Sequence, residues 1–159
     1  MPESEDDRLN RNLDQLLQEL RIVLPGVQVL FAFLLAVPFS SRFGQADGFE
    51  RDVYFAALLL SAVAVALLMA PSMQHRILFR REQKRYLINA ASLMTIAGMT
   101  ALALAVVLSL VLVAHFLFGS AAAWAAGGLS FFAFALLWYA LPIERRITNR
   151  HPDHERPPL

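Results

Sequence analysis

The segment PSMQHRILFRREQKRY, residues 71–86, is the only dense basic segment that lies between long apolar runs of this chain. Because cations accumulate on the cytoplasmic side of membrane helices, this segment fixes the side of a membrane on which its neighbours lie. It serves either as a topological anchor alone or as a contact site for anionic lipid headgroups or a partner protein, since each juxtamembrane cation contributes about 1 kcal/mol near an anionic surface. The candidate contact residues are His75, Arg76, Arg80, Arg81, Lys84 and Arg85.

The composition on both sides of this segment indicates a membrane protein. Of the 159 residues, 57% are hydrophobic and 17% are charged, whereas soluble domains average about 45–50% apolar and about 25% charged. The apolar residues form long runs, which indicates a lipid bilayer as their surroundings. A net charge of +1 gives no reason to expect nucleic acid as a partner. The absence of cysteine excludes disulfides, thiolate catalysis and Cys-ligated metals or clusters.

The apolar runs predict an all-α, polytopic fold, a bundle of four transmembrane helices within residues 9–142. Each run approaches or exceeds the roughly 20 residues that cross a hydrocarbon core of about 30 Å. The expected spans are residues 22–39, 53–70, 96–117 and 121–141. Because proline removes a helical hydrogen bond, we expect a kink or helix start at Pro25 and helix ends at Pro38, Pro71 and Pro142. A tight turn is expected at residues 118–120.

The two ends of the chain differ in character from these spans. Residues 1–8 are polar and predicted to be disordered, and their acidic composition is not that of a signal peptide. Residues 9–20 place leucines at helical spacing, which predicts an N-terminal amphipathic helix that lies at the membrane interface or packs on the protein itself. Residues 143–159 form a polar, proline-containing tail that we expect to be disordered.

The positions of the cations predict the orientation of the protein. Twelve of the 14 lysines and arginines precede the first span, separate the second from the third, or follow the fourth. The other two, Arg42 and Arg51, lie between the first and second spans. Four crossings place the twelve on one face, so we expect a multi-pass protein of the bacterial cytoplasmic membrane with both termini in the cytoplasm.

The spans themselves offer little chemistry. They contain no Asp, Glu, Lys or Arg, which argues against ion-coupled transport by a monomer. The candidate intramembrane polar residues are Gln28, interpreted as interhelical glue or a pore-lining group, and His115, interpreted as an interfacial, hydrogen-bonded side chain rather than a proton relay. No catalytic or phosphate-binding motif is present, and His151 and His154 lack further metal ligands. We therefore expect no enzyme activity, no cofactor and no metal site.

Small residues recur four apart in the spans, as at Ala97, Ala101 and Ala105. Such faces allow close approach of helices in lipid. We therefore expect a non-enzymatic integral membrane protein that is a homo-oligomer or an accessory subunit of another membrane protein. The alternative is an oligomeric ion channel, with Gln28 at its pore, or an ion-coupled antiporter.

Two stretches resemble a family of small four-helix membrane proteins of actinobacteria and their relatives, a domain of unknown function. They are ELRIVLPGVQVLFAFLL at residues 19–35, and the pairs Ala70–Pro71, His75–Arg76 and Phe79–Arg80. The resemblance implies a membrane fold without catalytic residues and makes Pro25, Gly26, Gln28, His75 and Arg76 signature positions. Some proteins of this kind are labelled sodium:proton antiporters, but this chain lacks a carboxylate within its apolar runs.

Overall fold

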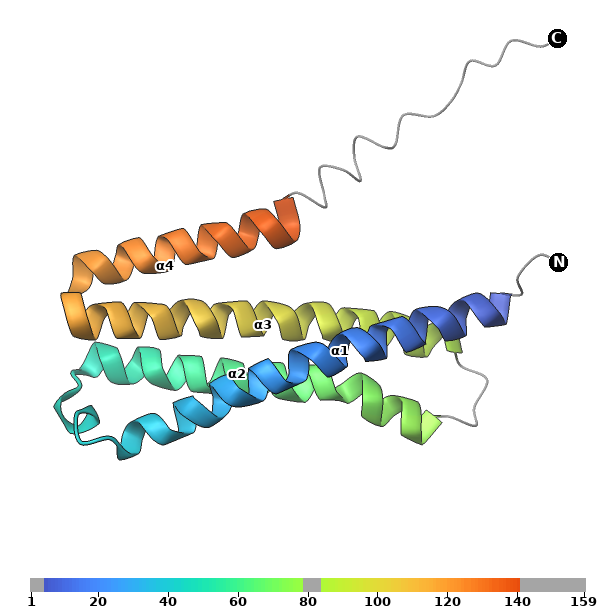
Figure 1. The fold of residues 1–159 in the computed structure, drawn as a ribbon, viewed down its shortest axis with the longest axis horizontal. Helices are drawn as coiled ribbons and strands as arrows, with labels where there is room; N and C mark the ends of the chain where they lie inside the picture. Colours follow the sequence, from blue (N-terminus) through green and yellow to red (C-terminus); the bar gives the residue numbers. More distant parts are fainter. Residues whose placement is uncertain (1–4, 79–83, 141–159) are drawn as a thin grey trace, which may run out of the picture.

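The computed structural model describes residues 5–78 and 84–140, and all of its regular structure there is helical. The long helices are α1 (Glu5–Ala36), α2 (Gly48–Leu78), α3 (Lys84–Phe118) and α4 (Ser120–Ala135) (Figure 1). Short 3₁₀ turns, η1 (Val37–Phe39) and η2 (Phe43–Gln45), connect α1 to α2, and a π-helical turn, η3 (Leu136–Ala140), continues α4. Within these described ranges, four segments are long and apolar enough to cross a membrane, which confirms the prediction of four apolar helices.

The hairpin of α2 and α3 is the centre of the fold. Small residues line its interface, since Ala57, Ser61 and Ala64 of α2 are fully buried and Ala105 of α3 is as well. At Gly98 a Cβ atom would lie 2.8 Å from Leu68 Cγ, so only glycine permits this approach of the two helices. The small residues thus allow a close, continuous contact along most of both helices.

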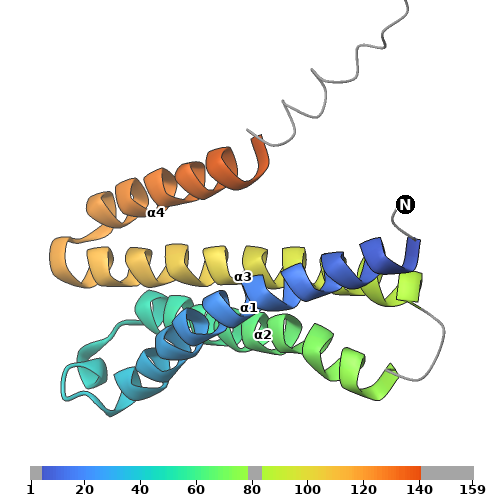
Figure 2. The same cartoon turned by 45° about the vertical axis from the view of Figure 1, so that its right-hand side comes forward.

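Helix α1 lies across α2 and α3 in both views (Figures 1 and 2). Two clusters of buried side chains hold it there. In the first, Leu20 and Val27 of α1 pack against Leu68 and its neighbours on α2 and α3. In the second, near the end of α1, Leu34 packs against Tyr54. Leucines of the predicted amphipathic segment, such as Leu16, therefore face the protein itself.

Helix α4 packs on α3 through the buried small residues Ala123 and Gly127. Within the described residues it has no packing contact with α1 or α2. Only 11% of the residues in the most apolar window of α1 and of α4 are buried, against 28% in α2 and in α3. The expected four-helix bundle is therefore open: α1, α2 and α3 form a core, and α4 adjoins one side of it (Figure 1).

One proline prediction requires correction. Pro71 does not end the second helix, because α2 continues through it to Leu78, and its ring is fully buried in the protein. Burial in that contact offsets the lost hydrogen bond, as is common in membrane helices. Of the two alternatives at Pro25, a kink or a helix start, the start is excluded, because the predicted amphipathic segment and the first span form the single helix α1. The expected end at Pro38 is confirmed, since α1 stops at Ala36.

The turn between α3 and α4 is confirmed at Gly119, which has a φ of 85° that side-chain-bearing residues rarely adopt. The Gly119 N–H donates a hydrogen bond to the His115 carbonyl over 2.9 Å, which caps the end of α3. At the far end of α4, the Tyr139 and Thr100 hydroxyls are hydrogen-bonded to each other. The antiparallel α3–α4 pair is therefore fixed near both of its ends.

We predict opposite effects of alanine at two adjacent glycines of α4. A Cβ at Gly127 would lie 2.6 Å from Val111 Cγ2, whereas a Cβ at Gly128 meets nothing within 4 Å. Gly127→Ala should lower the free energy of unfolding by about 1–3 kcal/mol through overpacking. Gly128→Ala, the matched control, should leave it unchanged or raise it by up to about 1 kcal/mol. Unfolding in detergent measures both, and equal effects would refute this packing of α4.

Candidate functional site

A buried carboxylate stands at the start of α2. The Glu50 backbone N–H donates to Asp47 Oδ1 over 2.8 Å, and the Asp47 backbone N–H donates to Glu50 Oε2 over 3.0 Å. This reciprocal pair is a capping box, in which two otherwise unpaired backbone donors are satisfied. The negative charges also lie at the positive end of the helix dipole. Glu50 is only 7% exposed, so the capping box positions a carboxylate inside the protein.

The last turns of α3 bring an imidazole to this carboxylate. His115 Nδ1 lies 3.1 Å from Glu50 Oε1, and a proton on that nitrogen is donated to the carboxylate. The Phe49 ring stands beside the imidazole at a centroid distance of 4.9 Å. The side chains of His115 and Glu50 are 20% and 9% exposed. The contact therefore joins the start of α2 to the end of α3 in a largely buried environment.

The connection between α1 and α2 is ordered by a second set of contacts. The Tyr54 hydroxyl donates to the Leu34 carbonyl over 2.9 Å, which joins α2 to the last turns of α1. The Phe43 ring packs edge-to-face on the Tyr54 ring at 4.9 Å. Backbone hydrogen bonds, such as that from Gln45 N–H to the Arg42 carbonyl, close the turns of this segment. Arg42 is thus carried on a fixed backbone.

Three of these side chains have the donor types of a metal site. One ligand atom each from Asp47, Glu50 and His115 lies within 4.8 Å of the other two. Two carboxylates and an imidazole are ligands that Zn²⁺ accepts. The oxygens Asp47 Oδ1 and Glu50 Oε2 already accept backbone hydrogens, and Glu50 Oε1 is engaged by His115. These hydrogen bonds account for the geometry without an ion.

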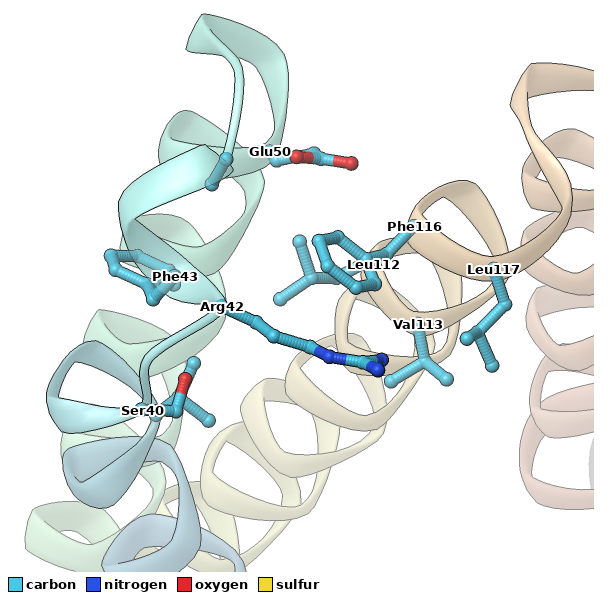
Figure 3. Close-up of a pocket in the computed structure, with 10 residues that line it drawn as sticks. Ser40, Arg42, Phe43, Glu50, Leu112, Val113, Phe116 and Leu117 are labelled. Atoms are coloured by element: carbon cyan, nitrogen blue, oxygen red, sulfur yellow. The ribbon is translucent and has the colours of Figure 1, made fainter.

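An apolar pocket of about 300 Å³ lies next to this cluster, between the α1–α2 connection and the end of α3 (Figure 3). Its charged lining residues are Arg42 and Glu50. The Arg42 side chain extends across the pocket toward Val113 (Figure 3). Among the described residues, the Arg42 guanidinium has no hydrogen-bond or ion-pair partner. The remaining lining residues are Val37, Ser40, Phe43, Ala46, Leu112, Val113, Phe116 and Leu117.

The residues singled out from the sequence fall at different places. His115 lies in the cluster just described, whereas Gln28 is exposed on α1 and belongs to neither this cluster nor the pocket. Arg76 is exposed near the end of α2. His75 lies in α2, and Lys84 and Arg85 lie in the first turn of α3, but their side chains are outside the described part. Arg80 and Arg81, like His151 and His154, lie outside the described residues altogether.

The sequence interpretation missed Glu50 as the partner of His115. The available signal was Asp47-Gly-Phe-Glu50, whose spacing before an apolar run is that of a capping box. That pattern places Glu50 in the first helical turn of α2, three residues before the predicted second span, which begins at residue 53. The partnership itself joins residues 65 positions apart. It depends on the antiparallel register of α2 and α3, which no local pattern encodes.

Comparison with known proteins gives one positive finding. A family model described as "Family of unknown function (DUF6328)" matches residues 2–142. No curated protein and no solved structure matches the chain. The family match covers all four long helices and the polar cluster, but it brings no activity with it.

We predict energetic coupling between Glu50 and His115. Glu50→Gln keeps an oxygen for the capping box but removes the charge, and His115→Leu removes the imidazole. In a double-mutant cycle the two changes should couple by about 1 kcal/mol in the free energy of unfolding, as contacting residues do. Denaturant unfolding in detergent at neutral pH measures each corner of the cycle.

The control for that cycle is Asp52→Asn, which removes a charge from an exposed carboxylate in the first turns of α2. With His115→Leu it should be additive within about 0.5 kcal/mol. Coupling as large for Asp52 as for Glu50 would show a general charge effect at this end of the protein and contradict a specific contact.

Proposed function

Because this chain belongs to DUF6328, a family of unknown function, we propose its role from the physics of its helices. It is a non-enzymatic, multi-pass integral membrane protein of the bacterial cytoplasmic membrane. It acts as a homo-oligomer or as an accessory subunit that binds another membrane protein. Four segments of membrane-spanning length and apolarity support insertion.

The arrangement of the helix ends supports an orientation with both termini in the cytoplasm. The α1–α2 connection and the α3–α4 turn lie at one end, and the start of α1, the end of α2 and the start of α3 lie at the other (Figure 1). Arg42 in the connection and Arg51 in the first turn of α2 are the cations between the first two spans, whereas the other twelve of the 14 precede the first span, separate the second from the third, or follow the fourth in the sequence. The positive-inside rule makes that second end cytoplasmic.

The observation that carries the association proposal is the outward face of α4. This helix contacts only α3 among the described helices, and Trp124, Leu129 and Phe132 are exposed on it. Ala125 and Gly128, which are small and also exposed, lie between them. A small-residue strip beside large apolar side chains allows another membrane helix to approach closely.

Other small-residue faces do not support association, because the fold already uses them. Ala57 and Ser61 of α2 and Ala101 and Ala105 of α3 are buried within the chain. Ala123 and Gly127 of α4 are buried against α3. Helix α4 therefore offers two faces of small residues, one used internally and one available to a partner.

The polar cluster is the observation that could support the alternative function, an ion-coupled antiporter or channel. Glu50 and His115 are an ionisable pair within the apolar segments Gly48–Gln74 and Asn89–Phe118, and such pairs serve as ion or proton relays in transporters. The pair lies at the ends of these segments, and Glu50 Oε2 is already engaged by the Asp47 backbone N–H while Oε1 is engaged by His115, which favours a structural role. Ion flux into proteoliposomes that Glu50→Gln abolishes and Asp52→Asn preserves would favour transport instead.

The orientation is testable because the chain has no cysteine and single cysteines label without background. Ser41→Cys lies in the exposed α1–α2 connection, and Ser4→Cys lies near the N-terminus. A membrane-impermeant maleimide should label Ser41→Cys in spheroplasts, and Ser4→Cys only after the membrane is permeabilised. The reverse pattern would refute the cytoplasmic placement of the termini. Labelling of both before permeabilisation would refute the four-span insertion.

The association proposal predicts a specific effect of bulk on α4. Gly128→Leu should reduce cross-linked oligomer or co-purified partner at least several-fold, because leucine blocks close approach. Ala133→Leu, an exposed position elsewhere on α4, is the matched control and should retain both. Cross-linking in native membranes followed by affinity purification measures the two species. A strictly monomeric chain without a partner would contradict the proposal.

A further inference from the structure

The apolar pocket beside Arg42 combines an open apolar space with a guanidinium that has no partner among the described residues. Neither the fold nor the polar cluster explains this combination. The pocket walls are hydrocarbon from Leu112, Val113 and Phe116 on α3 and from Phe43 on the α1–α2 connection. A volume of about 300 Å³ is at the lower limit of ordinary ligand pockets, which span roughly 300–1,000 Å³. This space suits a segment of one acyl chain rather than a whole lipid.

The positive charge of Arg42 favours an anion as the bound group. Arg42 reaches across the apolar lining (Figure 3), and its guanidinium has no partner within the described part of the chain. Glu50, the only acidic lining residue, directs its carboxylate into contacts with His115 and the Asp47 backbone. An arginine beside hydrocarbon is stabilised when an anionic group accepts its hydrogen bonds.

The location of the pocket identifies the source of that anion. The candidate spans end at Phe39 in η1 and Phe118 on α3, and that of α2 begins at Gly48. Arg42 therefore lies just beyond the apolar segments, at the depth of lipid headgroups, while Val113, five residues before the end of its segment, lies at the depth of the acyl chains. A molecule with an anionic head and an apolar tail matches both levels.

We propose that this pocket binds one anionic phospholipid of the leaflet at the α1–α2 end, with its phosphate on Arg42 and part of an acyl chain against Val113 and Phe116. The inference rests on the proposed membrane insertion but not on the proposed association. It is distinct from headgroup contacts of the basic segment, because residues 71–78 of that segment form the opposite end of α2 (Figure 1).

The pocket is preformed by contacts that do not involve the lipid. The Phe43–Tyr54 ring contact and the Tyr54–Leu34 hydrogen bond hold one wall, and the Glu50–His115 contact holds α3 beside the start of α2. A preformed site spends little binding free energy on ordering its own side chains. The lipid accordingly bridges the α1–α2 connection and α3.

The test is a titration of the purified full-length chain in nonionic detergent by native mass spectrometry. Phosphatidylglycerol and phosphatidylcholine with identical acyl chains serve as the probes. The wild-type chain should bind phosphatidylglycerol about fivefold more tightly, which is the contribution expected of one cation at an anionic headgroup. Arg42→Gln should abolish that preference. Arg51→Gln, a matched control that removes the other cation at this end from an exposed position, should keep it.

A second pair of variants tests the acyl-chain part of the site. Val113→Phe fills the pocket and should weaken binding of both lipids several-fold. Leu110→Phe, at an exposed position of α3 outside the pocket lining, should leave both unchanged. Unfolding of each variant without added lipid checks that the fold is intact. Binding that depends on Arg42 but not on Val113 would overturn the proposed seat of the acyl chain.

The outcomes against the proposal are specific. Equal wild-type affinities for the two lipids, or an equal loss in Arg42→Gln and Arg51→Gln, would overturn it in favour of bulk surface charge. Competition by millimolar inorganic phosphate would overturn it in favour of a free anion. Failure of insertion would appear separately, as chain recovered from cells without detergent.

Discussion

Close contact between α2 and α3 is the constraint on which the other features depend. In lipid there is no hydrophobic drive to bring helices together, so association relies on packing and on a few polar contacts. Ser61 and Ala64 on α2, and Gly98 and Ala105 on α3, keep side chains out of the interface and let the backbones approach. The register that results sets His115 opposite Glu50 and provides the surface on which α1 and α4 lie.

The α1–α2 end shows how one short polar segment serves several purposes. Asp47 begins α2 by capping it, and the same capping box orients Glu50 toward His115. Tyr54, one turn farther along α2, holds both the end of α1 and the ring of Phe43. Polar groups near the end of apolar helices are costly unless they are hydrogen-bonded. Their mutual satisfaction explains why this connection is ordered and why Arg42, which has no such partner among the described residues, stands apart.

The features that could be predicted from the sequence are those that depend on local composition. Long apolar runs indicate helices, and Gly119 after the third run indicates a turn, because these signals lie within one segment. The predicted helix end at Pro71 is wrong because local rules count its lost hydrogen bond but not the burial of its ring inside the protein. The pairing of Glu50 with His115 and the pocket at Arg42 depend on helix register. Register is decided by close approach at positions such as Gly98. That approach cannot be recognised from the sequence without knowing which helix packs there.

The continuity of α1 has a mechanical consequence. Its 32 residues extend about 48 Å at roughly 1.5 Å per residue, whereas a hydrocarbon core is about 30 Å thick. In the proposed insertion, residues 5–13 of the same helix precede its apolar segment Asp14–Phe39 and project beyond the apolar layer. Leu20 and Val27 clamp this rod to α2 and α3 along its middle. A force applied to this projecting segment would reach the apolar part of α1 through one continuous helix, with no loop between them.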